Sequence, residues 1–256
     1  MSRAELTDIF NLLHEALSHV PYAICGLTAL IDHGFTRRQA NRVSILCPQE
    51  SKNNIKAWAA ARGYPTTADS LGLPSHDGSL RRVRIKYIDT GFERLQRVRS
   101  RLSNATVLSP MSQLDNVAAG YLENRRRGDT RAVETVSKDL FWCLGYITTH
   151  RVRPNPRLLP TFLGEEFFAD FTASYPEARP AIALAGIDVA AVLAHHNTAA
   201  ILREHDEMLR SYGMAGDVLP SYPGQFERMG GLMHSQSIYT LREAAGTVSP
   251  APWSRP

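Results

Sequence analysis

The stretch Val20-Pro-Tyr-Ala-Ile-Cys-Gly-Leu-Thr-Ala-Leu-Ile-Asp-His-Gly-Phe-Thr-Arg37 decides the fold of this chain. Residues 22–26 are apolar and end in glycine, which is typical of a short buried strand. Residues 27–33 predict a short helix, which Gly34 ends because glycine readily adopts the backbone conformation found after a helix. Residues 42–47 alternate in polarity and predict a second strand, which Pro48 ends. The sequence therefore predicts a strand–helix–strand unit.

Further elements extend this unit in both directions. Helices are expected over residues 4–18 and 51–62, the second with Ser51 as its N-cap. Residues 66–79 predict a polar loop, and residues 80–88 and 105–108 predict two more strands. After these strands only helical patterns follow. They cover residues 111–124, 131–148, 161–173, 177–185 and 188–212, with a short piece near 237–245.

This order of elements predicts an α+β fold, in which a small mixed sheet flanked by helices precedes a helical C-terminal domain. We expect an α/β core over residues 1–108 and a helical domain over residues 109–212. Residues 213–256 are rich in Pro, Gly and Ser and predict a loosely packed tail.

The composition favours a globular protein in a reducing compartment. Apolar residues make up 43% of the 256 residues and charged residues 21%, a mix that excludes wholesale disorder. The longest apolar run, residues 22–31, is far shorter than the roughly 20 residues that span a bilayer. Three widely spaced cysteines indicate neither a disulfide framework nor a zinc site. We therefore expect a cytoplasmic protein without a membrane partner, and the oligomeric state stays open.

Positive charge is concentrated in the middle of the chain. Residues 81–157 hold 16 basic and 7 acidic residues, and the remainder holds 13 basic and 18 acidic residues. Arginines dominate this segment, with clusters at 81–86, 94–101 and 125–127. Such clusters can track a phosphate backbone, so the arginine-rich face is a candidate for contact with RNA. A solvated surface held by salt bridges is the alternative.

Two segments resemble the nucleotidyltransferase superfamily, in particular its minimal and abortive-infection-toxin-like members. The first is Val20–Arg37 with the strand at 42–47. The second is Leu108–Arg125 together with Lys138-Asp139-Leu140, which is similar to the helical segment that follows the core of these proteins. In this superfamily the first strand ends in Gly-Gly or Gly-Ser, and the second strand carries Asp-apolar-Asp. The resemblance covers residues 20–145 and implies a nucleotidyltransferase-like fold.

The chemistry that the resemblance implies needs carboxylates that this sequence lacks at the matching positions. Nucleotidyl transfer uses two divalent ions about 3.5–4 Å apart, which clustered carboxylates hold. Alternate positions of the second strand face the same side of a sheet, and here they are Arg42 and Ser44. The neighbouring strand offers Arg82 or Arg84, and Lys86. Cationic side chains repel a metal ion, so we predict a degenerate site that works without two-metal chemistry.

The same cationic side chains can bind a phosphate or carboxylate directly. We expect a small anionic ligand or nucleotide in this site, and we assign neither a catalytic residue nor a metal. Mg²⁺ is expected as a cofactor only if the protein is an active transferase. The candidate ligand-binding residues are Gly26, Thr28, Arg37, Arg42, Ser44, Arg84 and Lys86.

Other chemically capable residues favour structural roles. His33 follows Asp32 at the end of the short helix, where interaction with the helix dipole is a simpler reading than general-base catalysis. Cys47 is typical of a buried strand cysteine. The histidines at 195, 196 and 205 lack the i,i+4 spacing of a helical metal site and are predicted to be surface residues.

Three further hypotheses stay open. The protein could be an active nucleotidyltransferase whose carboxylates lie elsewhere in the chain. It could be a repurposed biosynthetic enzyme of specialised metabolism, with a tRNA-borne substrate as one form of that reading. It could also be a non-enzymatic interaction protein with a vestigial site.

Overall fold

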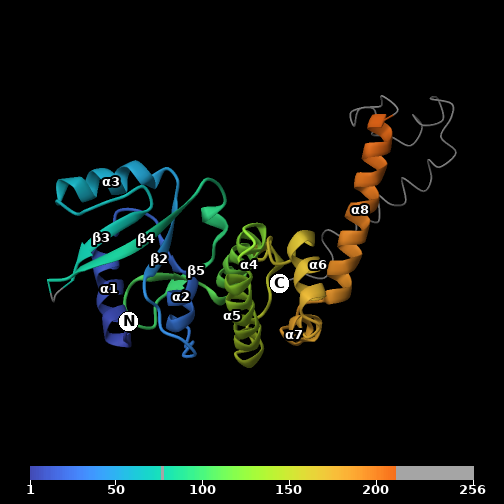
Figure 1. Ribbon diagram of the computed structural model, residues 1–256, viewed down its shortest axis with the longest axis horizontal. Coiled ribbons are helices and arrows are strands. Elements are labelled where there is room, and N and C mark those ends of the chain that lie inside the picture. The colour runs from blue at the N-terminus through green and yellow to red at the C-terminus, as the bar shows by residue number, and fades with distance from the viewer. Residues whose placement is uncertain (76–77, 212–256) are drawn as a thin grey trace. The chain divides into compact units, whose positions relative to one another are not determined.

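The structure, a computed structural model, describes residues 1–75 and 78–211 (Figure 1). The chain divides into two compact units, Met1–Gly186 and Ile187–Pro256. The first unit holds a sheet and most of the helices. The domain boundaries at residues 108 and 212 stay predictions. The helical piece expected near residues 237–245 lies outside the described residues.

In the described part of the chain, six strands form one mixed sheet in the order β3-β4-β2-β1-β6-β5. Strand β1 pairs antiparallel with β2 and parallel with β6, while β2 pairs parallel with β4. The expected α+β architecture is confirmed. The strands are β1 (Ala23–Cys25), β2 (Val43–Pro48), β3 (Ser70–Pro74), β4 (Leu80–Ile88), β5 (Arg97–Arg99) and β6 (Thr106–Leu108).

The central unit is β1, helix α2 (Gly26–Asp32) and β2, as the sequence predicts. The chain turns from strand into helix at Gly26, whose φ of +64° is a conformation that favours glycine. Helix α2 ends before Gly34, which has a φ of +109°. Two glycines therefore fix the short helix between the two central strands.

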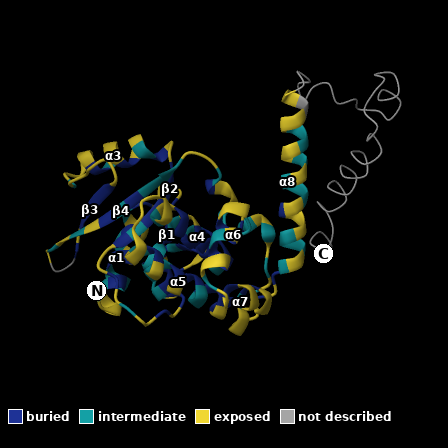
Figure 2. Cartoon of the chain, turned by 45° about the vertical axis from the view of Figure 1, so that its right-hand side comes forward, coloured by how far each residue is buried: buried dark blue, intermediate teal, exposed yellow. Residues whose placement is uncertain are grey.

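One face of the sheet is covered by helices α1 (Arg3–Ala16) and α3 (Ser51–Ala61). Helix α1 begins with a capping box, in which Ser2 and Glu5 satisfy each other's backbone N–H groups. Figure 2 shows that these helices are buried toward the sheet and exposed on the outer side. Buried residues of this core include Phe10, Ile24, Ile45, Ile55 and Val83.

The opposite face of the sheet carries the alternate residues of the same strands. A smaller apolar cluster there contains Ala23, Cys25, Leu46 and Leu108, packed with Phe92 from the 3₁₀ helix η1 (Phe92–Arg94). Helix α4 (Pro110–Arg126) follows β6 and contacts α2 and β6. Its N-cap is Ser109, which accepts a hydrogen bond from the backbone of Ser112.

The remaining helices of the first unit pack around α4. Helix α5 (Thr130–Thr149) lies against α4, and α7 (Ala178–Leu184) contacts α5 and α6 (Glu165–Ser174). An aromatic cluster fills the space between them, with ring centroids 5.1–5.6 Å apart in its main contacts. Its members are Tyr121, Phe162, Phe167 and Phe171. A 3₁₀ helix, η2 (Pro156–Leu158), joins α5 to this region.

In the second unit the structure describes helix α8 (Val189–Ser211). His195 is exposed, but His196 is buried and only 12% of the His205 side chain is exposed. The expectation that all three histidines lie at the surface is therefore wrong for His196, because the pattern of a lone helix does not tell which side is covered. Among the described helices none alone is long and apolar enough to cross a membrane. One pair separated by a sharp bend, Ala178–Leu184 with Val189–Met208, meets those criteria together.

The structure adds two strands that the sequence did not predict. Strand β3 lies in the expected loop, where Gly72 and Pro74 are typical of turns, yet it pairs antiparallel with β4. A Cβ at Gly72 would stand 2.7 Å from side-chain atoms of Leu80 and Pro65, so glycine permits this close pairing. Strand β5 has three exposed residues and pairs with β6. Helix α3 has Glu50, not Ser51, at its N-cap position.

Candidate functional site

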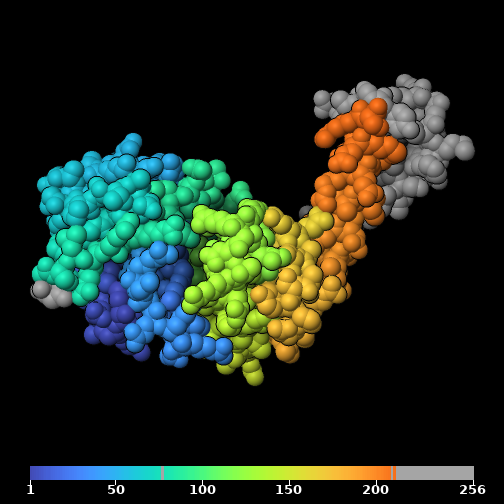
Figure 3. Space-filling view, viewed as in Figure 1, coloured from blue at the N-terminus to red at the C-terminus, as the bar shows by residue number. Residues whose placement is uncertain are grey.

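A cavity of about 370 Å³ opens on the face of the sheet that α1 and α3 leave free. Strands β2 and β4 and the start of α2 form one wall, and helices α4 and α5 form the other. Figure 3 shows the sheet-bearing part and these two helices side by side at the surface. Polar and charged side chains dominate both walls, so the cavity is suited to a polar ligand.

The structure brings six of the seven predicted site residues to this cavity: Gly26, Thr28, Arg42, Ser44, Arg84 and Lys86. The register of the sheet explains the grouping, because Ser44 lies opposite Arg84 and Leu46 lies opposite Lys86. Arg37 is exposed and does not line the cavity. Its neighbour Arg38 does.

The glycine turn in the cavity wall is held by a side chain of α4. The Gln113 amide accepts a hydrogen bond from the Gly26 N–H and donates one to the Gly26 carbonyl, both at 3.2 Å. Gln113 is fully buried, so this pair of bonds fixes the turn against the helix. Because the Gly26 N–H is already bonded, it is not a donor for a ligand. The Thr28 hydroxyl donates to the Cys25 carbonyl at 3.0 Å, which leaves the Thr28 oxygen free to accept.

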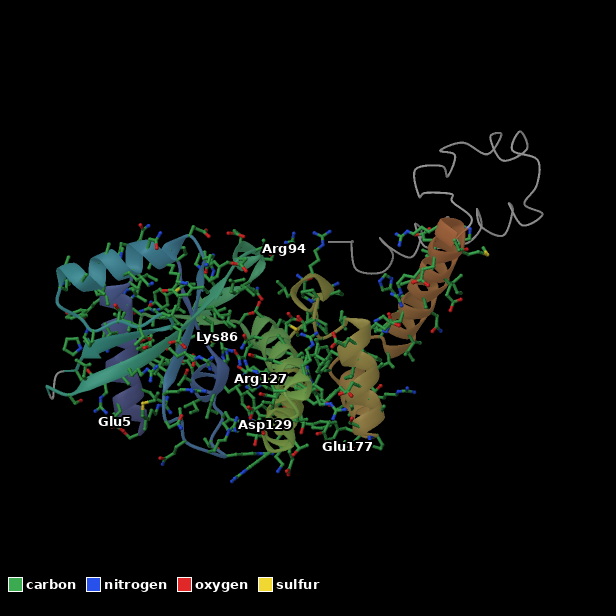
Figure 4. The ribbon with its side chains drawn as sticks, turned by 45° about the horizontal axis from the view of Figure 1, so that its top comes forward. Glu5, Lys86, Arg94, Arg127, Asp129 and Glu177 are labelled. Atoms are coloured by element: carbon green, nitrogen blue, oxygen red, sulfur yellow. The ribbon has the colours of Figure 1, made fainter. Side chains whose placement is uncertain are left out.

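The cations of the two walls differ in their pairing. Arg38, in the loop after α2, pairs with Asp139 of the helical wall, and Arg127 pairs with Glu123 at 2.5 Å. On the sheet wall Arg42, Arg84 and Lys86 form no ion pair within residues 1–75 and 78–211. Figure 4 shows Lys86 on β4 and Arg127 at the C-terminal end of α4. The sheet wall therefore presents net positive charge to the cavity.

Two carboxylates that the sequence reasoning did not place in the site lie on the helical wall. They are Glu123 of α4 and Asp139 of α5. The resemblance contained a signal for Asp139, since Lys138-Asp139 matches a basic-acidic pair that follows the core in nucleotidyltransferases. Only the packing of α5 against the cavity shows that this carboxylate reaches the site. In the described residues no group of three or more His, Cys, Asp or Glu is arranged to hold a metal ion.

Burial changes the proton affinity of two groups in the cavity wall. It raises the pKa of Asp139 to about 6, and the guanidinium of Arg38 opposes this effect. It raises the pKa of the Cys25 thiol to about 11, while the charges of Lys86 and Arg84 act to lower it. The field of these two cations therefore reaches the end of β1.

We expect anion binding to strengthen as the pH falls through about 6, the pKa of Asp139. Protonation removes the negative charge beside Arg38 and raises the net charge of the cavity. The nearby Cys143 thiol stays neutral because burial and Asp139 raise its pKa. Sulfate is a suitable probe, since its charge is constant in this range. Calorimetry should give roughly three- to tenfold tighter sulfate binding at low pH, and the Asp139→Asn variant should lose this dependence.

The same shift has a defined sign for stability. Folding raises the pKa of Asp139 above its ordinary value of 3.8, so this carboxyl favours the folded state most when protonated. Its contribution is complete at pH values below 3.8 and is lost as the pH rises through about 6.

For the binding experiment, the contradicting result is a sulfate affinity of the Asp139→Asn variant that varies with pH as it does in the natural protein. Asp139 would then not be the group whose protonation strengthens sulfate binding.

Asp32, His33 and Cys47 do not line the cavity, and their contacts indicate structural roles. Asp32 is buried and accepts hydrogen bonds from Ser100 and from the backbone of Arg101. The His33 ring is 2.8 Å from the Leu108 carbonyl, and burial lowers its pKa. Burial raises the pKa of Cys47 to about 12. Asp32 and His33 therefore tie α2 to the loop after β5 and to β6.

The arginine cluster at the end of α4 is largely neutralised by acidic partners. Arg125 pairs with Asp170 at 2.5 Å, and Arg126 pairs with Glu166 at 2.7 Å. Arg127 pairs with Glu123, as described above. The pairs of Arg125 and Arg126 connect α4 to α6, which is a structural role. An RNA contact by the arginine-rich face stays a prediction. Because Arg125, Arg126 and Arg127 have acidic partners, such a contact would have to be made by the cations of the sheet wall.

Solved structures with a similar fold include an antigenic nucleotidyltransferase-like protein from Paracoccidioides brasiliensis. Its TM-score is 0.54 at 16% identity, over 75% of this chain and 98% of that chain. The antibiotic-resistance factor ANT(2'')-Ia gives a TM-score of 0.38 at 14% identity, over 71% of this chain and 96% of that chain. That lower score adds nothing to the assignment. No protein-family model and no curated protein matches the sequence. The chain therefore has the nucleotidyltransferase-like fold that its sequence predicts.

Proposed function

We propose that the cavity binds a small ligand carrying phosphate or carboxylate groups through direct contact with cationic side chains. The observation that supports this function most strongly is that Arg42, Arg84 and Lys86 on one wall have no ion-pair partner among the described residues. The resemblance implies that metal-using nucleotidyltransferases carry their carboxylates at these strand positions. Here cations at these positions replace metal-bridged binding with charge-assisted hydrogen bonds.

The remaining polar groups suit the same ligand. Ser44 on β2 lies opposite Arg84 on β4 and can donate its hydroxyl proton to an anion. The partly enclosed wall strengthens each contact relative to one made in bulk water. Asp139, with a pKa of about 6, can exchange a proton near neutral pH and is the group we assign to proton transfer if the ligand is transformed.

An active nucleotidyltransferase is the second candidate, and the carboxylates of Glu123 and Asp139 favour it. Oxygen ligands of this kind bind Mg²⁺ in proteins, and both line the cavity. Each already has an arginine partner, Arg127 and Arg38 respectively, which a metal ion would have to displace. The two candidates therefore differ in whether the phosphate needs a metal ion. Incorporation of labelled nucleotide into RNA, protein or a small molecule with added Mg²⁺ would establish the second candidate.

A thermal-shift screen in the presence of EDTA tests the proposed function. We expect pyrophosphate, nucleotides or acidic metabolites at millimolar concentration to raise Tm by several degrees, because a ligand that binds the folded state stabilises it. Neutral nucleosides and sugars are the matched controls and should give no shift. A protein that responds to none of the anions would contradict the proposal and favour a non-enzymatic interaction protein.

A further inference from the structure

A second, smaller cavity adjoins the candidate site along strand β4. Its volume is about 280 Å³, and its lining consists of Arg42, Asp69, Arg82 and Arg84. Arg42 and Arg84 line both cavities. A ligand can therefore extend from one cavity into the other past the same two arginines.

Strand geometry arranges the cations of both cavities in a row. Arg82, Arg84 and Lys86 occupy alternate positions of β4 and share one face, as the buried Val83 and Ile85 share the other. At a rise of about 3.3 Å per residue, Arg82 and Lys86 lie roughly 13 Å apart along the strand. Arg42 directly precedes Val43, which pairs with Val83, so it lies beside the Arg82 end of this row.

The positive charge of the smaller cavity is only weakly neutralised by its one acidic residue. Its acidic residue Asp69 stands 4.0 Å from Arg82, and these side chains are 56% and 73% exposed. An exposed pair at this distance contributes little and is easily exchanged for a ligand. Asp69 is also held by local contacts, since its carboxylate accepts a hydrogen bond from Thr67 at 3.1 Å. Three arginines thus face one weakly engaged carboxylate.

We propose that the natural ligand is a small molecule with two separated anionic groups, phosphates or carboxylates, one in each cavity. This inference rests on the proposed function and extends it to a class of ligand. Lys86 and Ser44 bind the first group, Arg82 binds the second, and Arg42 and Arg84 contact the segment between them. The two volumes together fall within the 300–1,000 Å³ that is usual for small-molecule sites, which favours such a ligand over a polynucleotide.

Calorimetric titrations with orthophosphate, pyrophosphate and linear tripolyphosphate in EDTA test this inference. For the natural protein we expect affinity to rise with chain length. Arg82→Ala should weaken tripolyphosphate binding about tenfold and change orthophosphate binding less than twofold. Asp69→Asn should strengthen tripolyphosphate binding about threefold, because it removes the negative charge. The side-chain oxygen of the new asparagine can still accept the hydrogen bond from Thr67. Lys86→Ala should weaken the binding of both orthophosphate and tripolyphosphate.

Arg94→Ala is the matched control for charge. Arg94 lies on η1, is exposed and lines neither cavity, and Figure 4 shows its position relative to Lys86. If Arg94→Ala weakens tripolyphosphate binding as much as Arg82→Ala, the effect is general electrostatics and the second subsite is wrong. If orthophosphate binding depends on Lys86 but no variant distinguishes the probes, the inference fails and the proposed function stands. If no probe binds the natural protein, both fail.

Short single-stranded RNA forms the last arm of the same experiment. A small-molecule site should bind tripolyphosphate at least as tightly as an RNA of eight nucleotides at equal ionic strength. RNA binding that is tenfold tighter, depends on Arg82 and Lys86 and falls steeply with salt would overturn the small-molecule assignment.

Discussion

Replacing Lys86 with aspartate should weaken pyrophosphate binding by about 100-fold. Lys86 is half-buried in the cavity wall and makes no ion pair in the described residues, so its charge is directed to the cavity. A charge-assisted hydrogen bond contributes about 1.5–3 kcal/mol, and a new carboxylate adds repulsion of the anion. The expected loss is about 2.7 kcal/mol of binding free energy, measured by calorimetry in EDTA.

Arg94→Asp makes the same change of charge outside the cavity. We expect it to weaken pyrophosphate binding less than threefold, because exposed charges at a distance are screened by salt. Circular dichroism should confirm that both variants are folded. If Lys86→Asp and the natural protein bound pyrophosphate with equal affinity, neither Lys86 nor the sheet wall would belong to the binding site.

Replacing Gln113 with alanine should destabilise the fold by about 3 kcal/mol. The change removes both bonds to Gly26, a partly buried residue, and leaves its N–H without this acceptor, which costs about 1–3 kcal/mol. The lost side-chain volume adds a smaller cost, because Gln113 is fully buried. Urea unfolding followed by circular dichroism measures the change in the free energy of unfolding.

Two further variants separate the hydrogen bonds from the volume. Gln113→Met keeps most of the volume and should lose nearly as much stability as Gln113→Ala. Gln39→Ala removes an exposed glutamine and should change stability by less than about 0.5 kcal/mol. A Gln113→Met variant as stable as the natural protein would mean that the bonds to Gly26 contribute nothing to stability.

The sheet wall of the site was predictable because strand alternation is a local rule. Knowing that residues 42–47 and 80–88 are strands suffices to place Ser44, Arg84 and Lys86 on the polar face. The parallel register then sets Ser44 beside Arg84. The alternation within each strand does not depend on how the rest of the chain packs, whereas the register between the two strands does.

The helical wall was not predictable in the same way. Asp139 lies 95 residues beyond Ser44, and its place in the cavity depends on the packing of α5 against α4. A helix pattern indicates which residues are apolar, but it does not identify the neighbour that the polar face meets. The exchange of Arg37 for Arg38 has a similar cause, because both follow α2 in a loop where no periodicity sets the direction of a side chain.

Ion pairs between residues far apart in the chain also could not be predicted from the sequence. Arg125 and Arg126 form part of a basic run, but their partners Asp170 and Glu166 come from a helix some 40 residues later. Strand β3 shows the same limit for the backbone. Its Ser-Leu-Gly-Leu-Pro sequence is typical of a loop, and it forms a strand because β4 supplies a partner edge.

Titration of the natural protein with pyrophosphate, once in EDTA and once with millimolar Mg²⁺, tests the central claim most directly. The claim is that cationic side chains hold the anion without a metal ion. We predict one pyrophosphate bound per chain in EDTA, with an affinity that Mg²⁺ leaves unchanged or weakens by competing for the anion. Binding that occurs only with Mg²⁺ and is lost in Asp139→Asn or Glu123→Gln would contradict the claim.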